Sequence, residues 1–152
     1  MELKLKLHLI PSSAFYCNLK NKLGMGEWKK ISTLVREKKE SKCQFCGWVE
    51  DKKRKQYTHT HEEWEFIDGE QRLVDFECVC AECHKVHHWG RSSICGLNFE
   101  YLIKHACKVN RCTRSEFERH VEESFLEWEE RSKTKWTMNI NKLDEILLKY
   151  SS

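Results

Sequence analysis

Proline and glycine are scarce in this chain, which has one proline and six glycines among its 152 residues. This scarcity gives no sign of a flexible linker or a disordered tail. Long apolar runs are also missing, since no stretch approaches the roughly 20 consecutive apolar residues of a membrane-spanning helix. With 39% hydrophobic and 34% charged residues, the sequence predicts one folded, soluble unit with a modest hydrophobic core.

The number and placement of the cysteines argue against a disulfide framework. The nine cysteines are an odd number, and four of them stand in C-x-x-C pairs typical of metal sites. Residues 1–10 alternate apolar with polar or charged side chains, which is typical of a strand and not of a signal peptide. We therefore expect a reducing cytoplasm, with the other cysteines as buried residues or free thiols: Cys17, Cys78, Cys95, Cys107 and Cys112.

Two cysteine pairs have the spacing of a structural zinc site. Cys43 and Cys46 form the first pair, and Cys80 and Cys83 form the second after 33 intervening residues. Four such cysteines can close one tetrahedral tetrathiolate site. Cys78 could replace Cys80, but the C-x-x-C spacing favours Cys80. Bound zinc contributes roughly 10–16 kcal/mol in small modules and would compensate for the modest core.

Histidines adjoin the second cysteine pair and also lie between the pairs. His84 follows Cys83 directly, and His88 comes four residues later. If a helix begins near Cys83, these two side chains lie on one face and can share a second metal ion. The alternating stretch at 58–61 is typical of a strand, which could direct His61 toward that ion.

This order of motifs resembles the HNH (ββα-metal) endonucleases, in particular small stand-alone proteins of bacteria and their phages. Their core has Cys-x-x-Cys-Gly, then Cys-His-Glu-aliphatic-Trp, then Leu-Cys-x-x-Cys-His-x-x-x-His. The counterparts here are residues 43–47, 60–64 and 79–88. The likeness extends to the flanks of this core. Residues 10–13 with Trp28, and residues 128–132 with Trp136, resemble sequence positions found in those proteins. The resemblance then covers most of the chain.

The resemblance implies roles for the site residues. His61 would be the general base, because a neutral imidazole can take a proton from water for attack on a phosphodiester. Glu62 would orient His61 or contact a metal. His84 and His88 would hold a catalytic divalent ion (Mg²⁺, Mn²⁺, Ni²⁺ or Zn²⁺) beside the scissile phosphate and the leaving 3′-oxygen. Of the neighbours His87 and His88, either could instead be an exposed surface residue, and the i, i+4 spacing favours His88 as the ligand.

Two positions depart from the family pattern. Thr60 stands where many members have a metal ligand, and His59 could supply that ligand because residues 59 and 61 of a strand point the same way. The middle Asn of the motif is replaced by Asp75. Gln71 or Asp75 could brace the loop instead. These departures keep open an alternative, a weak or inactive HNH-like zinc module that binds nucleic acid or a partner protein.

The expected fold is α+β, with a zinc-stapled ββα-metal core at 41–92 and helical arms at 1–40 and 93–152, packed as one compact domain. In the strand expected at 3–10, Leu3, Leu5, Leu7 and Leu9 share one side, and Asp68-Gly69 is a turn signal. The other expected strands are at 57–61, 64–67 and 136–140. Helices are expected at 27–40, 97–109 and 142–150. Two more helices are expected, one beginning at about Cys83 and one running from a Ser115–Glu118 capping box to about residue 131.

Charge is distributed unevenly along the chain. Residues 1–57 carry 14 Lys/Arg and 6 Asp/Glu (+8), residues 58–79 carry 1 and 7 (−6), residues 80–114 carry 6 and 2 (+4), and residues 115–152 carry 6 and 9 (−3). Basic flanks around an acidic insert suit a protein that grips phosphate backbone beside a cation site. The expected partner is nucleic acid, foremost double-stranded DNA, with a basic cluster as one contact: Lys52, Lys53, Arg54 and Lys55.

Other partners follow from the N-terminal pattern and the resemblance. An amphipathic strand at 3–10 could pair through its edge with a second copy or with a partner protein. The resemblance implies that this protein acts in the cytoplasm of a bacterial cell and that a phage could encode it. The expected activity is hydrolysis of phosphodiester bonds in DNA by a metal-dependent endonuclease.

Overall fold

The computed structural model describes residues 2–94 and 99–151, and over these the protein is α+β, with a three-stranded sheet and seven α-helices. The elements, in chain order, are η1 (Ser12–Ala14), α1 (Leu19–Leu23), α2 (Met25–Lys38), β1 (His59–Ile67), β2 (Glu70–Val79), α3 (Ala81–His87), α4 (Trp89–Ile94), α5 (Phe99–Asn110), α6 (Arg114–Arg131), β3 (Thr137–Asn139) and α7 (Leu143–Ser151). No helix among the described residues is long and apolar enough to cross a membrane.

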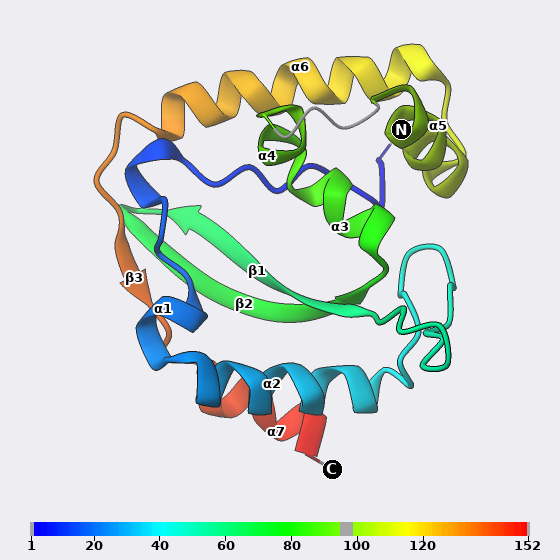
Figure 1. Ribbon diagram of the computed structural model, residues 1–152. Coiled ribbons are helices and arrows are strands. Elements are labelled where there is room, and N and C mark those ends of the chain that lie inside the picture. The colour runs from blue at the N-terminus through cyan, green and yellow to red at the C-terminus, as the bar shows by residue number, and fades with distance from the viewer. Residues whose placement is uncertain (1, 95–98, 152) are drawn as a thin grey trace.

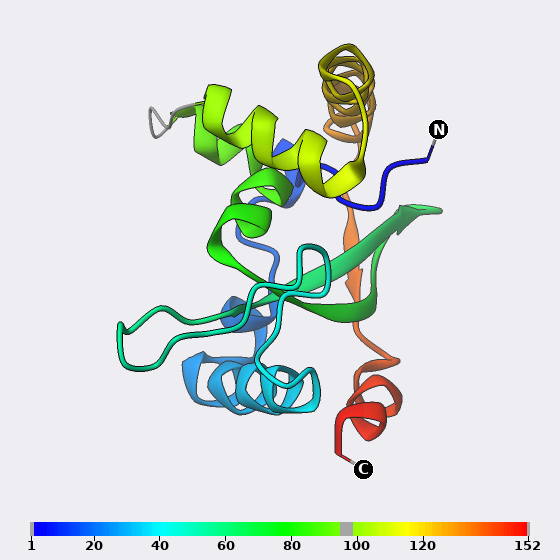
Figure 2. The same cartoon turned by 90° about the vertical axis from the view of Figure 1, so that its right-hand side faces the viewer.

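The sheet lies between two groups of helices. Figure 1 shows α3, α4, α5 and α6 on one side of the β1–β2 hairpin and α1, α2 and α7 on the other. In the perpendicular view, α2 and α7 run side by side beneath the sheet (Figure 2). The loops between α2 and β1 lie at the end of the hairpin where β2 leads into α3 (Figure 1). The loops that carry the first C-x-x-C pair therefore lie beside the start of α3.

The hairpin is held by the turn predicted at Asp68-Gly69. Both residues have positive φ, 52° and 76°, which is the backbone that a two-residue hairpin turn requires. β1 pairs antiparallel with β2, and β3 adds to β2 in parallel. The two short strands expected at 57–61 and 64–67 are one continuous strand, because a register shift between Glu63 and Trp64 takes up the irregularity without ending the pairing.

The strand expected at 3–10 does not form. Its alternation does predict burial, since Leu3, Leu5 and Leu7 are 7%, 0% and 7% exposed. The backbone is instead held by side chains, with the N–H of Leu5 donating to Asn110 Oδ1 (2.8 Å) and the N–H of Leu7 to His120 Nε2 (3.0 Å). These partners belong to α5 and α6, so residues 3–10 run between helices and do not form a sheet edge.

Two hydrophobic clusters stabilise the two helical layers. The first joins the N-terminal leucines to Val79, Val86, Leu102 and Phe117. The second joins α2 and α7 to Leu73, Phe76 and Trp64 on the other face of the sheet. Both clusters combine residues of the arms with residues of the 41–92 segment, so the two arms complete the packing of the hairpin.

Several helix boundaries differ from those expected. The α6 capping box uses Thr113 and Glu116, whose side chains each accept a backbone N–H of the other, and not the Ser115–Glu118 pair. Glu118 is instead paired with Arg114 (2.8 Å). α5 begins at Phe99, and the expected start at residue 97 lies outside the described residues. The helix expected near 27–40, the strand near 136–140 and the final helix form close to their predicted positions.

Candidate metal centre and histidine cluster

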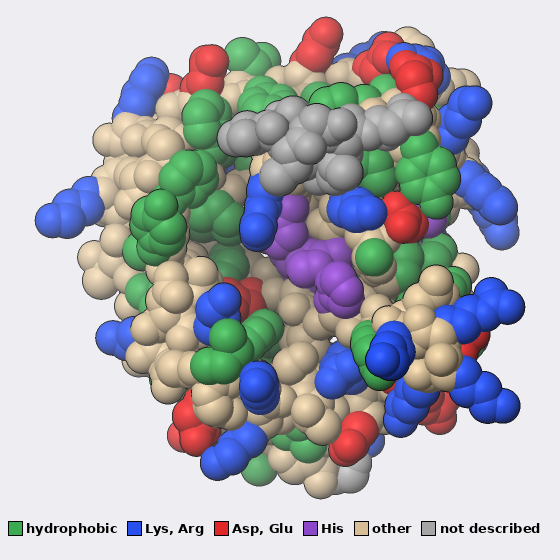
Figure 3. Space-filling model, in the orientation of Figure 1, with side chains coloured by type: hydrophobic (Ala, Val, Ile, Leu, Met, Phe, Trp, Pro, Cys, Tyr) green, Lys and Arg blue, Asp and Glu red, His purple; other side chains and the backbone are tan. Residues whose placement is uncertain are grey.

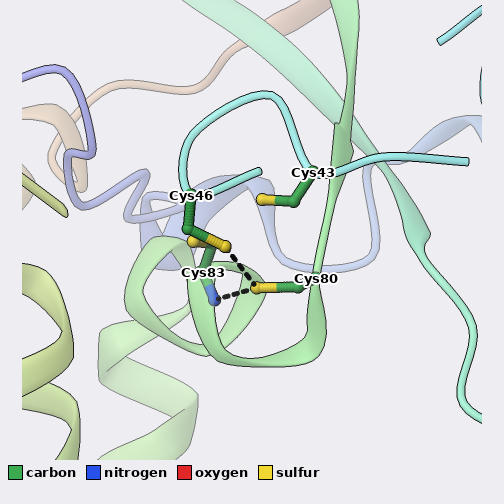
Figure 4. A group of neighbouring side chains, drawn as sticks. All are labelled: Cys43, Cys46, Cys80 and Cys83. Atoms are coloured by element: carbon green, nitrogen blue, oxygen red, sulfur yellow. Dashed lines mark hydrogen bonds between the residues drawn. The ribbon is translucent and has the colours of Figure 1, made fainter. Parts of the chain in front are cut away.

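Four cysteine sulfurs lie close together where the first C-x-x-C loop meets the start of α3 (Figure 4). All four Sγ atoms are within 4.8 Å of one another, and Cys46 Sγ is 3.6 Å from Cys80 Sγ. Tetrahedral zinc with Zn–S bonds of ≈ 2.3 Å would place its sulfurs about 3.8 Å apart. The predicted set of Cys43, Cys46, Cys80 and Cys83 is therefore brought together in a geometry consistent with a structural zinc site.

Local backbone geometry accounts for this convergence. Gly47 has a φ of 79°, which lets the first loop turn tightly enough for its N–H to reach the carbonyl of Cys43 (2.9 Å). Cys80 is the N-cap of α3, so its sulfur accepts the N–H of Cys83 at 3.4 Å. The hydrogen bond from Cys80 lowers the pKa of the Cys43 thiol, and the reciprocal contact raises that of Cys80 to about 12. A bound cation would favour the deprotonated form of all four thiols.

Among the described residues, the other cysteines do not join this group. Cys78 is buried, its backbone N–H donates to Gln44 Oε1 (3.0 Å), and burial raises the pKa of its thiol. Cys17, Cys107 and Cys112 are free, and Cys95 lies outside the described residues. The choice of Cys80 over Cys78 thus agrees with the geometry.

His105 is a neighbour of the cysteine group that the sequence did not point out. Its Nε2 lies 3.2 Å from Cys83 Sγ, and it comes from the buried face of α5. A ring N–H at this distance can donate to a thiolate, as partners of metal ligands commonly do. The only sequence signal was helical spacing, which predicted packing and not this polar contact.

His61, His84 and His88 form a second group that could hold a metal ion, with one nitrogen of each within 4.8 Å of the others. His84 Nε2 and His88 Nε2 are 3.1 Å apart. The ring planes are inclined by 75° (His61 and His84), 72° (His61 and His88) and 64° (His84 and His88). Because an imidazole lone pair lies in its ring plane, three steeply inclined rings can direct one nitrogen each at a common point.

His88 reaches this group from just beyond the end of α3. The helix begins at Ala81 and ends at His87, and His88 is the C-cap. Its N–H still donates to the carbonyl of His84 (3.0 Å), so the i, i+4 relationship survives the end of the helix. The predicted pairing of residues 84 and 88 on one face is therefore what the structure shows.

His59 contacts the group without belonging to it. Its Nδ1 lies 2.9 Å from His84 Nδ1, and its side chain is exposed. We expected His59 as a third ligand and His61 as a separate base. The geometry instead places His61 together with His84 and His88, and leaves His59 as a neighbour of His84.

His87 is buried, which excludes the exposed position considered for it. Its Nδ1 donates to the carbonyl of Lys6 (2.7 Å), and its Nε2 lies 2.7 Å from Glu77 Oε2 without the alignment of a hydrogen bond. The His87 ring stacks on His8 (centroids 4.0 Å apart, planes inclined by 13°) and on His61 (4.3 Å, 16°). The lone pairs of nearly parallel stacked rings do not converge, so this buried stack is poorly arranged to hold an ion.

The histidines around the centre are held in the neutral form. Burial, reinforced by neighbouring histidines, lowers the pKa of His8 to about 2, of His84 to about 3 and of His88 to about 4. The pKa of His61 is also well below its ordinary value, again mainly because of burial. Neutral imidazole is the form that binds metal ions and accepts protons. The cluster is therefore prepared for either role near neutral pH.

Glu62 and Thr60 point away from the histidines. The Glu62 carboxylate accepts the N–H of Leu19 (3.1 Å) and of the Trp64 indole (2.8 Å). The Thr60 hydroxyl donates to the carbonyl of Ser32 (3.1 Å). Alternate side chains of a strand point to opposite faces, so residues 59 and 61 face α3 while residues 60 and 62 face the α1–α2 layer. The Glu62 carboxylate is therefore engaged on the face of the strand opposite His61, and its expected role in orienting His61 or contacting a metal stays a prediction.

The residues considered as substitutes for the missing Asn stabilise other contacts. Asp75 accepts the hydroxyl of Tyr150 (2.6 Å) and the ammonium of Lys149 (2.9 Å), linking β2 to α7. Gln71 is 1% exposed and donates to the carbonyl of Cys17 (2.9 Å). Each braces the hairpin against a neighbouring segment from one of the arms.

Basic side chains lie around the histidines. Histidines (purple) gather in a hollow of one face, with Lys and Arg side chains (blue) about it (Figure 3). After burial, the charges of Arg36 and Lys85 contribute to the lowered pKa of His59, and that of Arg91 to those of His84 and His88. The cluster singled out from the sequence, Lys52 to Lys55, instead lies in an exposed turn closed by the Asp51–Gln56 bridge.

The flanking positions named in the resemblance contact one another. The Trp128 indole donates to the carbonyl of Ile10 (2.9 Å), and the N–H of Ser12 donates to Ser132 Oγ (3.0 Å). The Trp136 indole donates to the carbonyl of Arg131 (2.8 Å). The residues before α1 are thereby tied to the end of α6.

Comparison of this chain with protein-family models, with curated proteins and with solved structures gives no match. A functional proposal therefore depends on the sequence motifs and on the geometry of the two clusters.

Proposed function

We propose that this protein is a metal-dependent endonuclease of the HNH (ββα-metal) type that hydrolyses phosphodiester bonds in DNA. The observation that carries the proposal is the convergence of His61 from β1 with His84 and His88 at α3. An antiparallel hairpin followed by a helix, with histidines between them, is the arrangement that this class requires. The adjoining four-cysteine group would hold a structural zinc ion that fixes the start of α3.

The histidine group fits a divalent ion. Two ligands of a tetrahedral ion with bonds of ≈ 2.0–2.1 Å lie about 3.3 Å apart, close to the 3.1 Å between His84 Nε2 and His88 Nε2. An imidazole set without a carboxylate suits Zn²⁺, Ni²⁺ or Mn²⁺ better than Mg²⁺. When bound, a divalent ion supplies charge neutralisation at the scissile phosphate and the leaving 3′-oxygen.

His61 needs a free lone pair for its role in this proposal. As a base, it accepts a proton from the attacking water. As a ligand, it completes the set with His84 and His88. The two roles differ in a measurable way, because removing a base leaves the ion bound, whereas removing a ligand weakens its binding.

The surroundings of the cluster support a phosphodiester substrate. Arg36, Lys85 and Arg91 are near enough to affect the histidine pKa values. Figure 3 shows histidines in a hollow of one face, with Lys and Arg side chains about it. Cations in such positions bind backbone phosphates and carry no sequence information. Binding should therefore weaken as salt concentration rises.

The test is plasmid cleavage by the wild type and by His61→Ala, with EDTA, Mg²⁺, Mn²⁺, Ni²⁺ or Zn²⁺. The wild type should nick or linearise DNA with a divalent ion, and His61→Ala should lose at least 100-fold of the rate, as is usual for loss of an acid–base group. His120→Gln is the matched control, since His120 contacts Leu7 and lies outside the cluster. Cleavage by His61→Ala at the wild-type rate would refute the proposal.

Metal content separates the two roles of His61. Mass spectrometry should find about one zinc per chain after EDTA treatment, held by the cysteine group. Titration with Ni²⁺ should then show unchanged affinity in His61→Ala if His61 is the base, and a loss of at least tenfold if it is a ligand.

A second candidate function is a zinc-stapled module that binds nucleic acid without cutting it. The observation in its favour is Thr60, which occupies a family ligand position and is hydrogen-bonded to Ser32 on the opposite face. This alternative predicts salt-dependent binding with no turnover under any of the metals.

A further inference from the structure

The side chain of His8 contacts His61, although the two residues are 53 positions apart in the chain. His8 Nδ1 lies 2.8 Å from His61 Nε2, a distance that requires one proton between the two nitrogens. The contact is shielded from solvent, because His61 is 4% exposed and the His8 ring is stacked on the fully buried His87.

The position of His8 is fixed by its own backbone. The N–H of His8 donates to the carbonyl of His87 (2.9 Å), and the carbonyl of Lys6 accepts from the His87 ring (2.7 Å). One residue earlier, Leu7 is held by His120. His8 is therefore presented to His61 by a backbone that is held at His8 itself and at the two residues before it.

The proton between the two rings decides whether His61 can act. A neutral imidazole carries one proton on its two nitrogens. If His8 Nδ1 donated, His61 would accept at Nε2 and would carry its own proton on Nδ1, so neither nitrogen would have a free lone pair. If His61 Nε2 donates, its Nδ1 lone pair is free to bind an ion or to accept a proton.

We infer that His8 is a positioning residue, whose Nδ1 accepts a hydrogen bond from His61 Nε2 and holds His61 in the tautomer with a free Nδ1 lone pair. This inference rests on the proposed function, because only a His61 that binds an ion or accepts a proton needs that lone pair. A metal-site histidine generally donates its second N–H to such a partner, which fixes both tautomer and orientation.

The tautomer can be measured directly in the full-length, zinc-loaded protein. Long-range ¹H–¹⁵N NMR distinguishes protonated from unprotonated imidazole nitrogens, with His61→Gln and His8→Asn spectra to assign the signals. In the wild type, we expect His61 to be protonated at Nε2. His61 protonated at Nδ1 in the wild type would overturn the inference.

Substitutions at residue 8 test the functional consequence. His8→Leu removes the acceptor and keeps much of the bulk, whereas His8→Asn can place its Oδ1 where Nδ1 lies. After the cysteine group is filled with zinc, His8→Leu should lower Co²⁺ affinity in calorimetric titration about 10–100-fold if His61 is a ligand. If His61 is the base, His8→Leu should instead lower the rate of plasmid cleavage about 10–100-fold and leave Co²⁺ affinity unchanged. In His8→Asn, the Co²⁺ affinity should stay within a few-fold of the wild type.

His120→Leu is the matched control, because it removes a hydrogen bond from the same segment and leaves the His8 ring in place. It should keep Co²⁺ affinity within a few-fold of the wild type. Equal losses in His8→Leu and His120→Leu, or no difference between His8→Leu and His8→Asn in either Co²⁺ affinity or cleavage rate, would overturn the inference. If the wild type bound no Co²⁺ at the histidines, the proposed function would fail. The NMR measurement of the His61 tautomer would then still test whether His8 accepts the hydrogen bond.

Discussion

His84, His87 and His88 belong to one short stretch of chain, yet their rings have different surroundings. The rings of His84 and His88 are inclined to each other by 64°, and both residues form one group with His61. His87 points into the protein, where it donates to Lys6 and lies against Glu77. Ring direction, set by the turn of the helix, thus separates the candidate ligands from a buried neighbour of the same residue type.

Cys43→Ser and Cys78→Ser should have different effects on zinc content. Cys43 belongs to the four-sulfur group, so its substitution removes one ligand, and we expect loss of zinc together with a large fall in melting temperature. Cys78 is equally buried but outside the group, so Cys78→Ser should retain about one zinc and lose only about 1–3 kcal/mol. Mass spectrometry and thermal melting measure both quantities. Full zinc content in Cys43→Ser would contradict the assignment.

Residue types and spacing predicted part of the site. The C-x-x-C pairs and the 84/88 spacing are local, so sequence separation alone indicated which atoms could meet. His8 is 53 positions from its contact His61, and His105 is 22 positions from its contact Cys83. Neither stands in a local motif, and only the packing of α3 against α5 and the N-terminal segment brings them there.

Secondary structure elements show the same limit at a larger scale. The alternation of residues 3–10 correctly indicated one buried side, because apolar side chains that recur at every second residue lie on the same side of an extended chain. It did not indicate what would bind the backbone, and side chains of α5 and α6 take the place of a neighbouring strand. Predicting a strand requires a partner strand, which no pattern within one segment can identify.

The contact between β2 and α7 makes stability depend on pH. Burial of Asp75 is outweighed by hydrogen bonds from Tyr150 and Lys149, so the pKa of this carboxyl is lowered. A group with a lowered pKa in the folded state stabilises the protein above its unfolded pKa of about 3.9, and this contribution is lost as pH falls through the folded value.

Asp75→Asn should therefore lower the free energy of unfolding by about 1–3 kcal/mol at pH 7. The difference from the wild type should shrink as pH falls below 4, because the wild-type carboxyl then becomes protonated. Asp144→Asn, an exposed substitution on α7, is the control and should have a small effect at both pH values. Urea unfolding at pH 7 and pH 3 measures both variants, and a constant difference would contradict the prediction.

For the whole molecule, the arms and the segment at 41–92 share their cores. Leu5, Leu102 and Phe117 belong to the same buried cluster as Val79, Cys83 and Val86. Ile31 and Tyr150 likewise cover Phe76 on the other side of the sheet. The residues that carry the motifs thus depend on both ends of the chain for their apolar contacts.

A fragment of residues 41–92 should bind zinc but not fold cooperatively. Its cysteines are all present, whereas most of the apolar side chains that bury Val79 and Val86 are missing. We expect poor chemical-shift dispersion outside the cysteine loops and no cooperative thermal transition, with the full chain as the control. A well-dispersed spectrum and a sharp melt would show that the arms are dispensable for folding.

The anchoring of residues 5–8 also has a consequence for biosynthesis. The segment that carries His8 is translated before its partners, since Asn110 and His120 follow the residues they bind by 105 and 113 positions. Translation at ≈ 5–20 residues per second separates the two events by several seconds at least. A nascent chain that ends before residue 110 therefore lacks the side chains that hold the backbone of Leu5 and Leu7, and the N-terminal segment is anchored in full only after α5 and α6 have been made.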